Sequence, residues 1–233
     1  VAPRSIDLGN PFLESLDGVC EFLLIRHGEQ QFDPAAALRH NVDAPLSELG
    51  DRQAVAVGER LAAMAVDAVY ASPLQRALHT GRAIAGHHGL DVHPTQALSE
   101  IELWVGLDQD RSLLDNLGPD ELTSIYRAAG ASRRWDAYPY SEDPAGFRTR
   151  VRAAFDTIAA DHEGERVVVA CHGGVINAFL AGIFGSPHDT VVTVHHTSIS
   201  MVRAAGERRA VVTVNDFAHV LPFQTERDPL NAA

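Results

Sequence analysis

The stretch CEFLLIRHGE (residues 20–29) leads an apolar run directly to an arginine and a histidine. Two further short runs rich in strand-forming residues, DAVYAS (67–72) and RVVVAC (166–171), also each precede a helical pattern. Apolar runs that alternate with helices indicate parallel strands covered on both faces. The sequence therefore predicts an α/β fold, a three-layer sandwich whose mainly parallel sheet carries helices on both faces.

Helical spacing and end signals predict four helices. Ser47 and Ser72 stand where N-caps are expected. Pro73 and Gln75 add the first-position and capping-box signals behind Ser72. A proline opens the third helix, and Gly185 closes the fourth. The expected helical segments are residues 45–64, 72–88, 144–162 and 175–185.

The other segments are expected to complete a single domain spanning residues 1–233. Residues 196–204 and 208–216 are β-rich runs around a short turn, which predicts a hairpin at one edge of the sheet. Residues from about 104 to 143 are rich in Asp, Arg and aromatics with weak periodicity. We expect them to form a small inserted lobe over the functional site. Residues 1–18 are expected to be an N-terminal extension.

Composition excludes several classes of protein. All 19 basic side chains are arginine, so the chain has no P-loop lysine, Schiff-base lysine or lysine base. No Gly-rich dinucleotide fingerprint, HExxH or GxSxG motif occurs. The net charge of −12 disfavours nucleic acid and membrane surfaces as partners. Two cysteines and no recognisable signal peptide predict a cytoplasmic protein, and the sequence leaves a homo-oligomer open.

Three of the predicted strands end beside basic side chains. Arg26 and His27 follow the first strand, Arg76 lies in the helical turn after the second, and His172 follows the third. Ligands of open α/β sheets bind outside the carboxyl ends of the strands, so these groups should converge on one crevice. The backbone N–H of Gly173, at the start of the next helix, adds a further donor. The set predicts an anion pocket suited to phosphate.

In such a pocket an imidazole can attack phosphorus in line, while arginines and a second histidine neutralise charge on the other phosphoryl oxygens. The product is a phosphohistidine. The departing alkoxide needs a proton, which requires a carboxylic acid of raised pKa opposite the nucleophile. Glu100 and Glu102, near another apparent strand end, are the candidates.

The pattern of these residues resembles the histidine phosphatase superfamily, also called phosphoglycerate mutase-like. A single tetrapeptide would be weak evidence, but five blocks follow the family's order at plausible spacing and span most of the chain. The blocks are RHGE (26–29), PLSELGDRQA (45–54), SPLQRALHT (72–80), LSEIELWVG (98–106) and HGGVI (172–176).

The resemblance implies that His27 is the phospho-accepting nucleophile and that Arg26, Arg76 and His172 hold the phosphoryl group. It also implies a glutamate proton donor and a reaction that uses no metal ion or other cofactor. The arginines and a protonated histidine would supply the positive charge that Mg²⁺ supplies in other phosphoryl-transfer enzymes.

The family's proton donor follows a Leu-x-Glu pattern, which here matches Leu98 and Glu100 and assigns Glu100. Glu102 is the alternative, because this block is two residues shorter than the usual one before Trp104. The expected catalytic set is therefore His27, Glu100 and His172.

Two positions after RHGE depart from the family's pattern. Gln30 stands where Ser or Thr is usual, and Asp33 stands where the family has an Asn that contacts the phosphate. An ionised Asp33 beside a phosphate would be repulsive. It is therefore expected to turn away, to be protonated, or to hold Arg26 in place.

The segment SRRWDAYPYSEDPAGFRTRV (132–151) resembles that of small phosphatase members, whereas mutases carry a longer, more basic insertion. This favours a phosphomonoesterase acting on a small phosphorylated metabolite. A cofactor-dependent phosphoglycerate mutase and a non-catalytic phospho-ligand binding module are the alternatives. Arg133 and Arg134 could bind a second anionic group, but solvation or pairing with a nearby Asp is the favoured interpretation. Trp135 is expected either to line the pocket mouth or to pack the lobe.

The remaining histidines and cysteines are interpreted as structural. The doublets 87–88 and 195–196 are poor chelators, because neighbours in sequence point to different faces, and no metal site is expected. Cys171 is interpreted as a small hydrophobe. Cys20 should lie roughly 20 Å from it along a neighbouring strand, too far for a disulfide.

Overall fold

The computed structural model describes residues 10–223, so the first half of the predicted extension, residues 1–9, lies outside the described residues. Within that range six strands form one sheet in the order β3-β2-β4-β1-β5-β6. Strands β1 to β4 run parallel to one another, and β5 and β6 are antiparallel. The strands are β1 Cys20–Arg26, β2 Ala68–Ala71, β3 Val92–Pro94, β4 Arg166–Cys171, β5 Ile199–Ala205 and β6 Arg208–Asp216.

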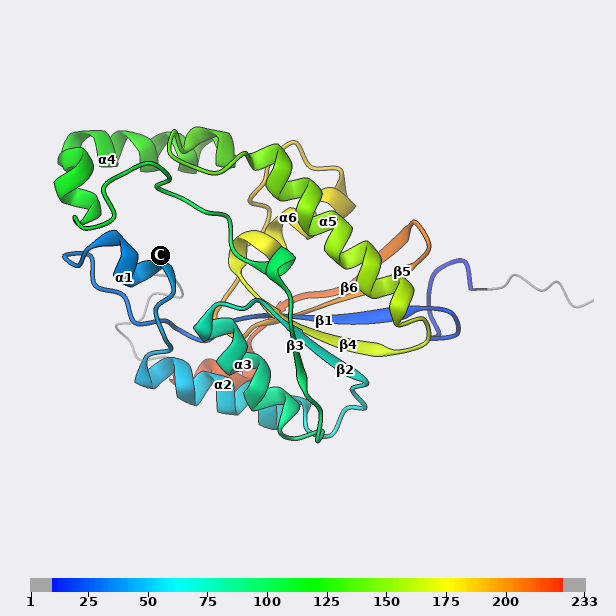
Figure 1. The fold of residues 1–233 in the computed structure, drawn as a ribbon. Helices are drawn as coiled ribbons and strands as arrows, with labels where there is room; N and C mark the ends of the chain where they lie inside the picture. The colour runs from blue at the N-terminus through cyan, green and yellow to red at the C-terminus, as the bar shows by residue number, and fades with distance from the viewer. Residues whose placement is uncertain (1–9, 224–233) are drawn as a thin grey trace, which may run out of the picture.

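Helices cover both faces of this sheet, which confirms the predicted three-layer α/β sandwich (Figure 1). Phe22 and Leu24 of β1 pack on the side of α5 and α6, whereas Leu23 and Ile25 pack on the side of α2 and α3. This alternation follows from the two-residue repeat of a strand. The helices are α1 Leu38–Val42, α2 Glu48–Leu61, α3 Gln75–Ala85, α4 Leu113–Ser132, α5 Pro144–Asp161 and α6 Gly173–Phe184, with short turns η1 Gln96–Leu98, η2 Trp135–Ala137 and η3 Ala218–Phe223.

The end signals predicted at Ser47, Pro144 and Gly185 are confirmed, whereas the one at Ser72 is not, and α6 begins two residues earlier than expected, at Gly173. Ser47 caps α2 by accepting the Gly50 N–H at 3.0 Å, and Gly185 ends α6 in the left-handed conformation. Ser72 does not cap α3, because the helix begins two residues later than predicted and its N-cap, Leu74, makes no side-chain bond. The Ser72 hydroxyl instead bonds a histidine, as described below. Local sequence could not show this competing partner, because it comes from a different strand.

The segment expected to form the lobe contains a helix that its weak periodicity did not indicate. Helix α4 spans 20 residues and is kinked at Gly118, whose φ of 75° interrupts the helix just before Pro119. In Figure 1 it lies beyond the end of the sheet, on the side of α5. The ring of Tyr126, in this helix, packs edge to face with those of Trp104 and Tyr138, and the three ring centroids lie 5.8 to 6.3 Å apart. No helix within residues 10–223 is long and apolar enough to span a membrane.

The register of β1 and β4 shows that the two cysteines lie at opposite ends of the sheet. Arg26 lies opposite Cys171, so Cys20 lies at the far end of the neighbouring strand, and both cysteines are buried and unbridged. Burial raises the pKa of both thiols, that of Cys20 to about 12. Both therefore stay protonated and behave as small hydrophobes, as the sequence predicted.

Glu21 is the charged residue inside the first apolar run, and it is completely buried. Its Oε1 accepts from Arg166 Nε at 2.6 Å, and its Oε2 accepts from Arg203 Nε at 2.7 Å. Burial by itself raises the pKa of Glu21, but the hydrogen bonds from the two guanidiniums outweigh it and lower the pKa. The charge therefore ties β1 to both neighbouring strands, β4 and β5.

Candidate active site

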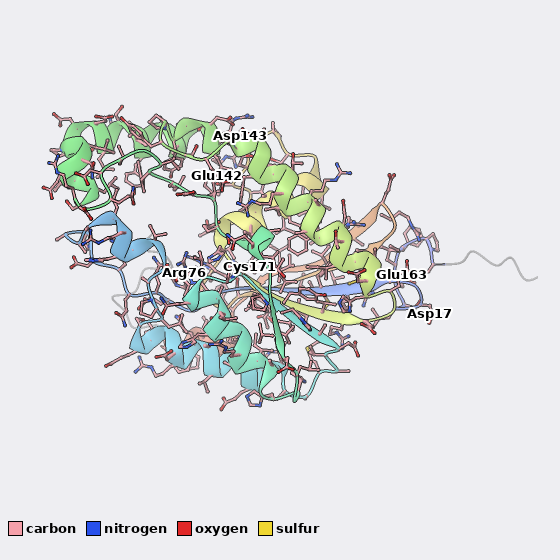
Figure 2. The ribbon with its side chains drawn as sticks, viewed as in Figure 1. Asp17, Arg76, Glu142, Asp143, Glu163 and Cys171 are labelled. Atoms are coloured by element: carbon pink, nitrogen blue, oxygen red, sulfur yellow. The ribbon has the colours of Figure 1, made fainter. Side chains whose placement is uncertain are left out.

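The predicted site residues meet at the carboxyl ends of the parallel strands. His27 directly follows β1 and donates its backbone N–H to Cys171 O at 2.9 Å. His172 directly follows β4, and Arg76 lies in the first turn of α3, which follows β2. Figure 2 shows Arg76 and Cys171 near the middle of the molecule, away from Glu163 at the opposite end of the sheet. The parallel register therefore gathers residues that are far apart in sequence.

The ring of His27 lies against the other two basic groups. Its centroid is 5.0 Å from that of His172, and its Nε2 is 3.3 Å from Arg76 Nε. Its Nδ1 lies 2.7 Å from the Gly28 carbonyl oxygen, which can only accept, so Nδ1 carries the ring proton. Burial, with His172 and Arg76 nearby, holds the pKa of His27 well below its usual value. The ring is therefore neutral, with the lone pair on Nε2 facing the cluster.

His172 is fully buried and held by Ser72, whose Oγ lies 2.8 Å from Nε2. That hydroxyl accepts the Leu74 N–H at 3.3 Å, and no other acceptor for its own proton is found among residues 10–223, so the proton is assigned to the bond to Nε2. Burial and the cationic groups Arg76 and Arg26 hold the pKa of His172 well below its usual value, so the ring is neutral and carries its proton on Nδ1. This differs from the protonated histidine expected from the sequence, because the buried ring lies beside two guanidiniums. No described residue accepts a hydrogen bond from this Nδ1.

Arg26 supplies a second buried donor without a partner. One end of its guanidinium donates to Val194 O, whereas its Nε has no acceptor among residues 10–223. Gly173, the first residue of α6, lies beside it, because a Cβ there would be 3.8 Å from Arg26 Nε. Buried polar groups in proteins are normally satisfied. The cluster therefore presents donors for an anion.

Two features hold the RHGE block in place: Thr80 bonds both Gly28 and Arg76, and Gly28 packs closely against Gly50. Thr80 Oγ1 accepts the Gly28 N–H at 3.1 Å and donates to Arg76 O at 2.8 Å. A Cβ on Gly28 would come within 3.1 Å of the Gly50 Cα and closer still to its carbonyl oxygen. Only glycine lets the turn after β1 pack directly on α2, which explains the glycines in the RHGE and LSELG blocks.

Glu100 is the acid that the structure places at the cluster. Its Oε2 accepts the Gly174 N–H at 3.0 Å and its Oε1 accepts the Ile101 N–H at 3.1 Å. Burial raises the pKa of Glu100, although these bonds and the nearby arginines oppose the rise. Glu102 is exposed, and its backbone pairs with Glu142. The geometry therefore favours Glu100 over Glu102 as the proton donor.

The structure shows how the two departures from the family pattern are accommodated. Asp33 is exposed and its carboxylate accepts the Ala35 N–H at 2.9 Å, so it turns away from the histidines. Of the three expected outcomes for Asp33, this is the first. Gln30 forms an isolated antiparallel bridge with Leu46.

The predicted lobe residues are engaged elsewhere. Arg134 donates to Asp136 at 2.8 Å and to the Pro187 carbonyl at 3.0 Å, which agrees with the favoured interpretation of a paired arginine. Arg133 is exposed at the end of α4 in the left-handed conformation. Trp135 packs against the apolar core on the side of α5 and α6. No hydrogen bond or ring contact within residues 10–223 joins these three to the histidine cluster.

His196, which was interpreted as structural from the sequence, lies beside the histidine cluster. Its ring centroid lies 5.7 Å from that of His27, whereas its neighbour His195 packs on Phe217 with centroids 4.1 Å apart. The predicted hairpin could have indicated that this segment lies near the site. An antiparallel strand beside β1 must begin where β1 ends, so residues just before β5 lie at the site.

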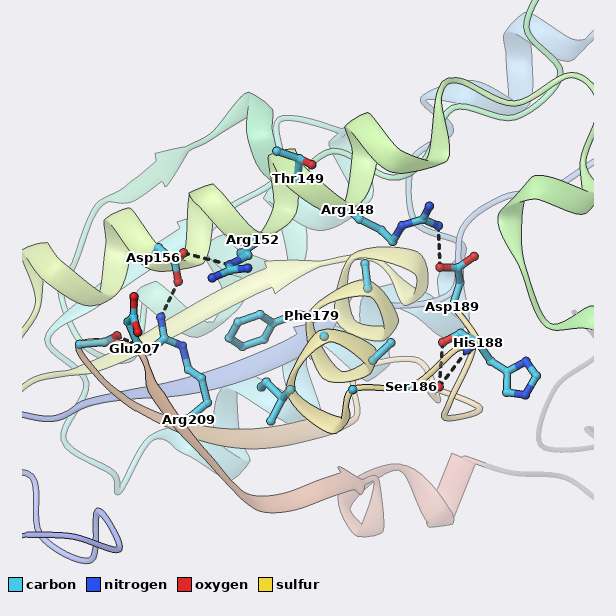
Figure 3. Close-up of a pocket in the computed structure, with 16 residues that line it drawn as sticks. Arg148, Thr149, Arg152, Asp156, Phe179, Ser186, His188, Asp189, Glu207 and Arg209 are labelled. Carbon is cyan, nitrogen blue, oxygen red and sulfur yellow. Dashed lines mark hydrogen bonds and ion pairs between the residues drawn. The ribbon is translucent and has the colours of Figure 1, made fainter.

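A separate cavity of about 810 Å³ lies between α5, α6 and the β5–β6 turn (Figure 3). Its basic groups are already paired, Arg148 with Asp189 at 2.8 Å and Arg209 with Asp156. None of the residues of the histidine cluster lines it. Nowhere in residues 10–223 do three His, Cys, Asp or Glu side chains gather as a metal site would need.

Comparison with known proteins agrees with this geometry. A metal-independent phosphoserine phosphatase of Arabidopsis thaliana is 29% identical over 216 residues, covering 87% of this chain and 84% of that protein. An Erwinia tasmaniensis protein named "Probable phosphoglycerate mutase GpmB" is 30% identical over 164 residues, covering 70% of this chain and 74% of that protein. The solved structure of Bacillus stearothermophilus YhfR has a TM-score of 0.71 at 25% identity, covering 86% of this chain and 99% of that one.

The family model of the histidine phosphatase superfamily (branch 1) matches residues 22–217. This range contains the histidine cluster, all five sequence blocks and the whole sheet except the first two residues of β1. The chain therefore belongs to the histidine phosphatase superfamily.

Proposed function

We propose that the chain is a metal-independent phosphomonoesterase that acts through a phosphohistidine at His27. One observation carries the proposal. The neutral His27 ring turns its Nε2 lone pair toward the cluster, where it accepts from Arg76 Nε at 3.3 Å, and buried donors on Arg26 and His172 have no partner among the described residues. A phosphoryl group held by those donors satisfies them and meets the lone pair.

In the first step, Nε2 of His27 forms a bond to phosphorus while the bond to the ester oxygen breaks. The lowered pKa of His27 favours this step, because only the neutral ring can attack. Arg76 Nε already points at the same nitrogen, so it lies where an equatorial phosphoryl oxygen would be bound. The two arginines and His172 then stabilise the charge on those oxygens in the transition state.

Glu100 supplies the proton that the leaving oxygen requires. Its raised pKa favours the protonated acid. In the second step, the resulting carboxylate takes a proton from water as the water oxygen attacks phosphorus. The bond between phosphorus and His27 breaks, and inorganic phosphate and the protonated Glu100 are restored.

We propose a small phosphorylated metabolite as substrate, selected by the lobe of residues 104–143. The relatives named phosphoserine phosphatase support this class. The engaged Arg134 favours hydrolysis over a mutase reaction, because a mutase grips a second phosphate. The relative named for phosphoglycerate mutase keeps the mutase as the second candidate.

The test is a phosphatase screen over sugar phosphates, phosphoserine, phosphoglycerates, nucleotides and phosphopeptides, run beside His27→Ala. We expect turnover by the wild type, none by the variant, and acid-labile phosphate on the wild type after rapid quenching with substrate. A coupled assay with and without bisphosphoglycerate separates the mutase. An active His27→Ala enzyme contradicts the proposal, and phosphate binding without turnover indicates the binding module instead.

A further inference from the structure

The segment before β5 is fastened to Arg26 from two directions. The Val194 carbonyl accepts from the Arg26 guanidinium, and the Thr197 N–H donates to the Arg26 carbonyl oxygen at 2.9 Å. His196 lies between these two anchors. Its position relative to the phosphoryl-binding arginine is therefore fixed by hydrogen bonds to both the side chain and the backbone of that arginine.

These anchors present the His196 ring to the nucleophile. The ring centroids of His196 and His27 are 5.7 Å apart with an interplanar angle of 48°. The His27 ring therefore contacts two other imidazoles, those of His172 and His196. Within residues 10–223 no hydrogen bond engages a ring nitrogen of His196. Its neighbour His195, by contrast, packs on Phe217.

The charge of the ring suits a binding role among guanidiniums. Burial, Arg26 and His195 lower the pKa of His196 to about 3, so the ring is neutral at physiological pH. A neutral imidazole keeps one N–H donor without adding a third positive charge beside Arg26 and Arg76. Asp33, in the loop after RHGE, points away and offers no contact from that side.

We propose that His196 is a further phosphoryl-binding residue, which donates a hydrogen bond from its imidazole to a phosphoryl oxygen during transfer to and from His27. This inference rests on the proposed phosphatase function and adds a residue to that site. The bond stabilises the charge that develops on the equatorial oxygens, so its loss affects turnover and the binding of inorganic phosphate together.

The experiment compares His196→Ala, His196→Asn and His196→Gln with the matched control His195→Phe, which keeps a ring over Phe217. Kinetic constants are measured on the best substrate from the screen, and competitive inhibition is measured with inorganic phosphate and orthovanadate. Removing one hydrogen bond to a charged group should lower kcat/KM of His196→Ala roughly ten- to a hundredfold. The inhibition constant for phosphate should rise in parallel.

The amide variants test the donor itself. Asn and Gln place an N–H near the positions of the two ring nitrogens, so at least one should recover most of the loss, and His195→Phe should stay close to the wild type. Thermal unfolding is recorded for every variant, so that a folding defect in His196→Ala leaves the amide variants to decide.

Three results would overturn the inference. They are kcat/KM and phosphate inhibition of His196→Ala within about twofold of the wild type, amide variants no better than alanine, or an equal loss in His195→Phe. Failure of the proposed function looks different, because the wild type would then be inactive throughout the screen or His27→Ala would be active. Phosphate binding to the wild type and His196→Ala, followed by thermal shift, still tests His196 in that case.

Discussion

Replacing Gly174 by alanine should displace Glu100, the proposed proton donor, without touching any side chain proposed to bind phosphate. A Cβ at this position would lie 3.1 Å from Glu100 Cδ and closer still to Oε1. Carbon atoms in contact are normally about 3.5–4.0 Å apart, so the carboxyl group must move by on the order of 1 Å. The movement also breaks the 3.0 Å bond from the Gly174 N–H to Oε2.

The size of the loss follows from that displacement. A 1 Å misplacement of a reacting group costs roughly a hundredfold in rate. We therefore expect kcat of Gly174→Ala on an alkyl phosphate to fall about a hundredfold, while KM changes little because Arg26, Arg76 and His172 keep their places. On p-nitrophenyl phosphate the loss should be much smaller, because that leaving group departs without a proton.

The assay is steady-state kinetics on both esters, with Gly182→Ala as the control. Gly182 lies in the same helix, and a Cβ there would have no neighbour within 4 Å. The control reports the effect of added helix propensity alone. A folded Gly174→Ala enzyme that turns over the alkyl ester within threefold of the wild type, or loses equally on both esters, would refute the assignment of Glu100.

Three further predictions concern pH and stability. Activity should fall as pH rises through the raised pKa of Glu100, because the acid then loses its proton. On the acid side, activity should fall only where His27, whose pKa is lowered, becomes protonated. A pH profile of kcat/KM for Glu100→Gln that still falls at alkaline pH as in the wild type would count against this assignment. Gly28→Ala should destabilise the fold by roughly 3 kcal/mol through its clash with α2, as measured by urea unfolding; an unchanged midpoint would contradict the close packing. Glu21→Ala should cost about 3 kcal/mol by leaving two guanidiniums unpaired. Because folding lowers the pKa of Glu21, its contribution is present above the unfolded pKa and is lost as pH falls through the folded one, so the urea midpoints of the wild type and Glu21→Ala should converge at low pH.

Short-range signals predicted the central strands, the edge hairpin and four of the helices, but not α1, α4 or β3. Helix caps, such as Ser47 and Gly185, depend on bonds within one turn, and the strand runs depend on apolar residues that any two-sided burial requires. The placement of Arg26, His27 and His172 at strand ends followed from the rule that parallel strands finish at one edge.

Contacts between segments distant in sequence could not be predicted in the same way. Ser72 has the local signature of a helix cap, yet the neighbouring strand brings His172 within 2.8 Å and takes its hydroxyl. The Leu-x-Glu pattern favoured Glu100 over Glu102, but the sequence could not show that Glu100 is half-buried and accepts the N–H of Gly174, from a helix 74 residues away, whereas Glu102 is exposed.

The sequence alone thus determined that Arg26, His27, Arg76 and His172 share one edge of an α/β sheet, because periodicity and capping are local properties and parallel strands end at one edge. Only the tertiary structure decided the tautomers of His27 and His172, the direction in which Asp33 points and the presence of His196 beside His27. These features depend on hydrogen bonds and packing between strands and loops, and such contacts form only once the strands have paired in register.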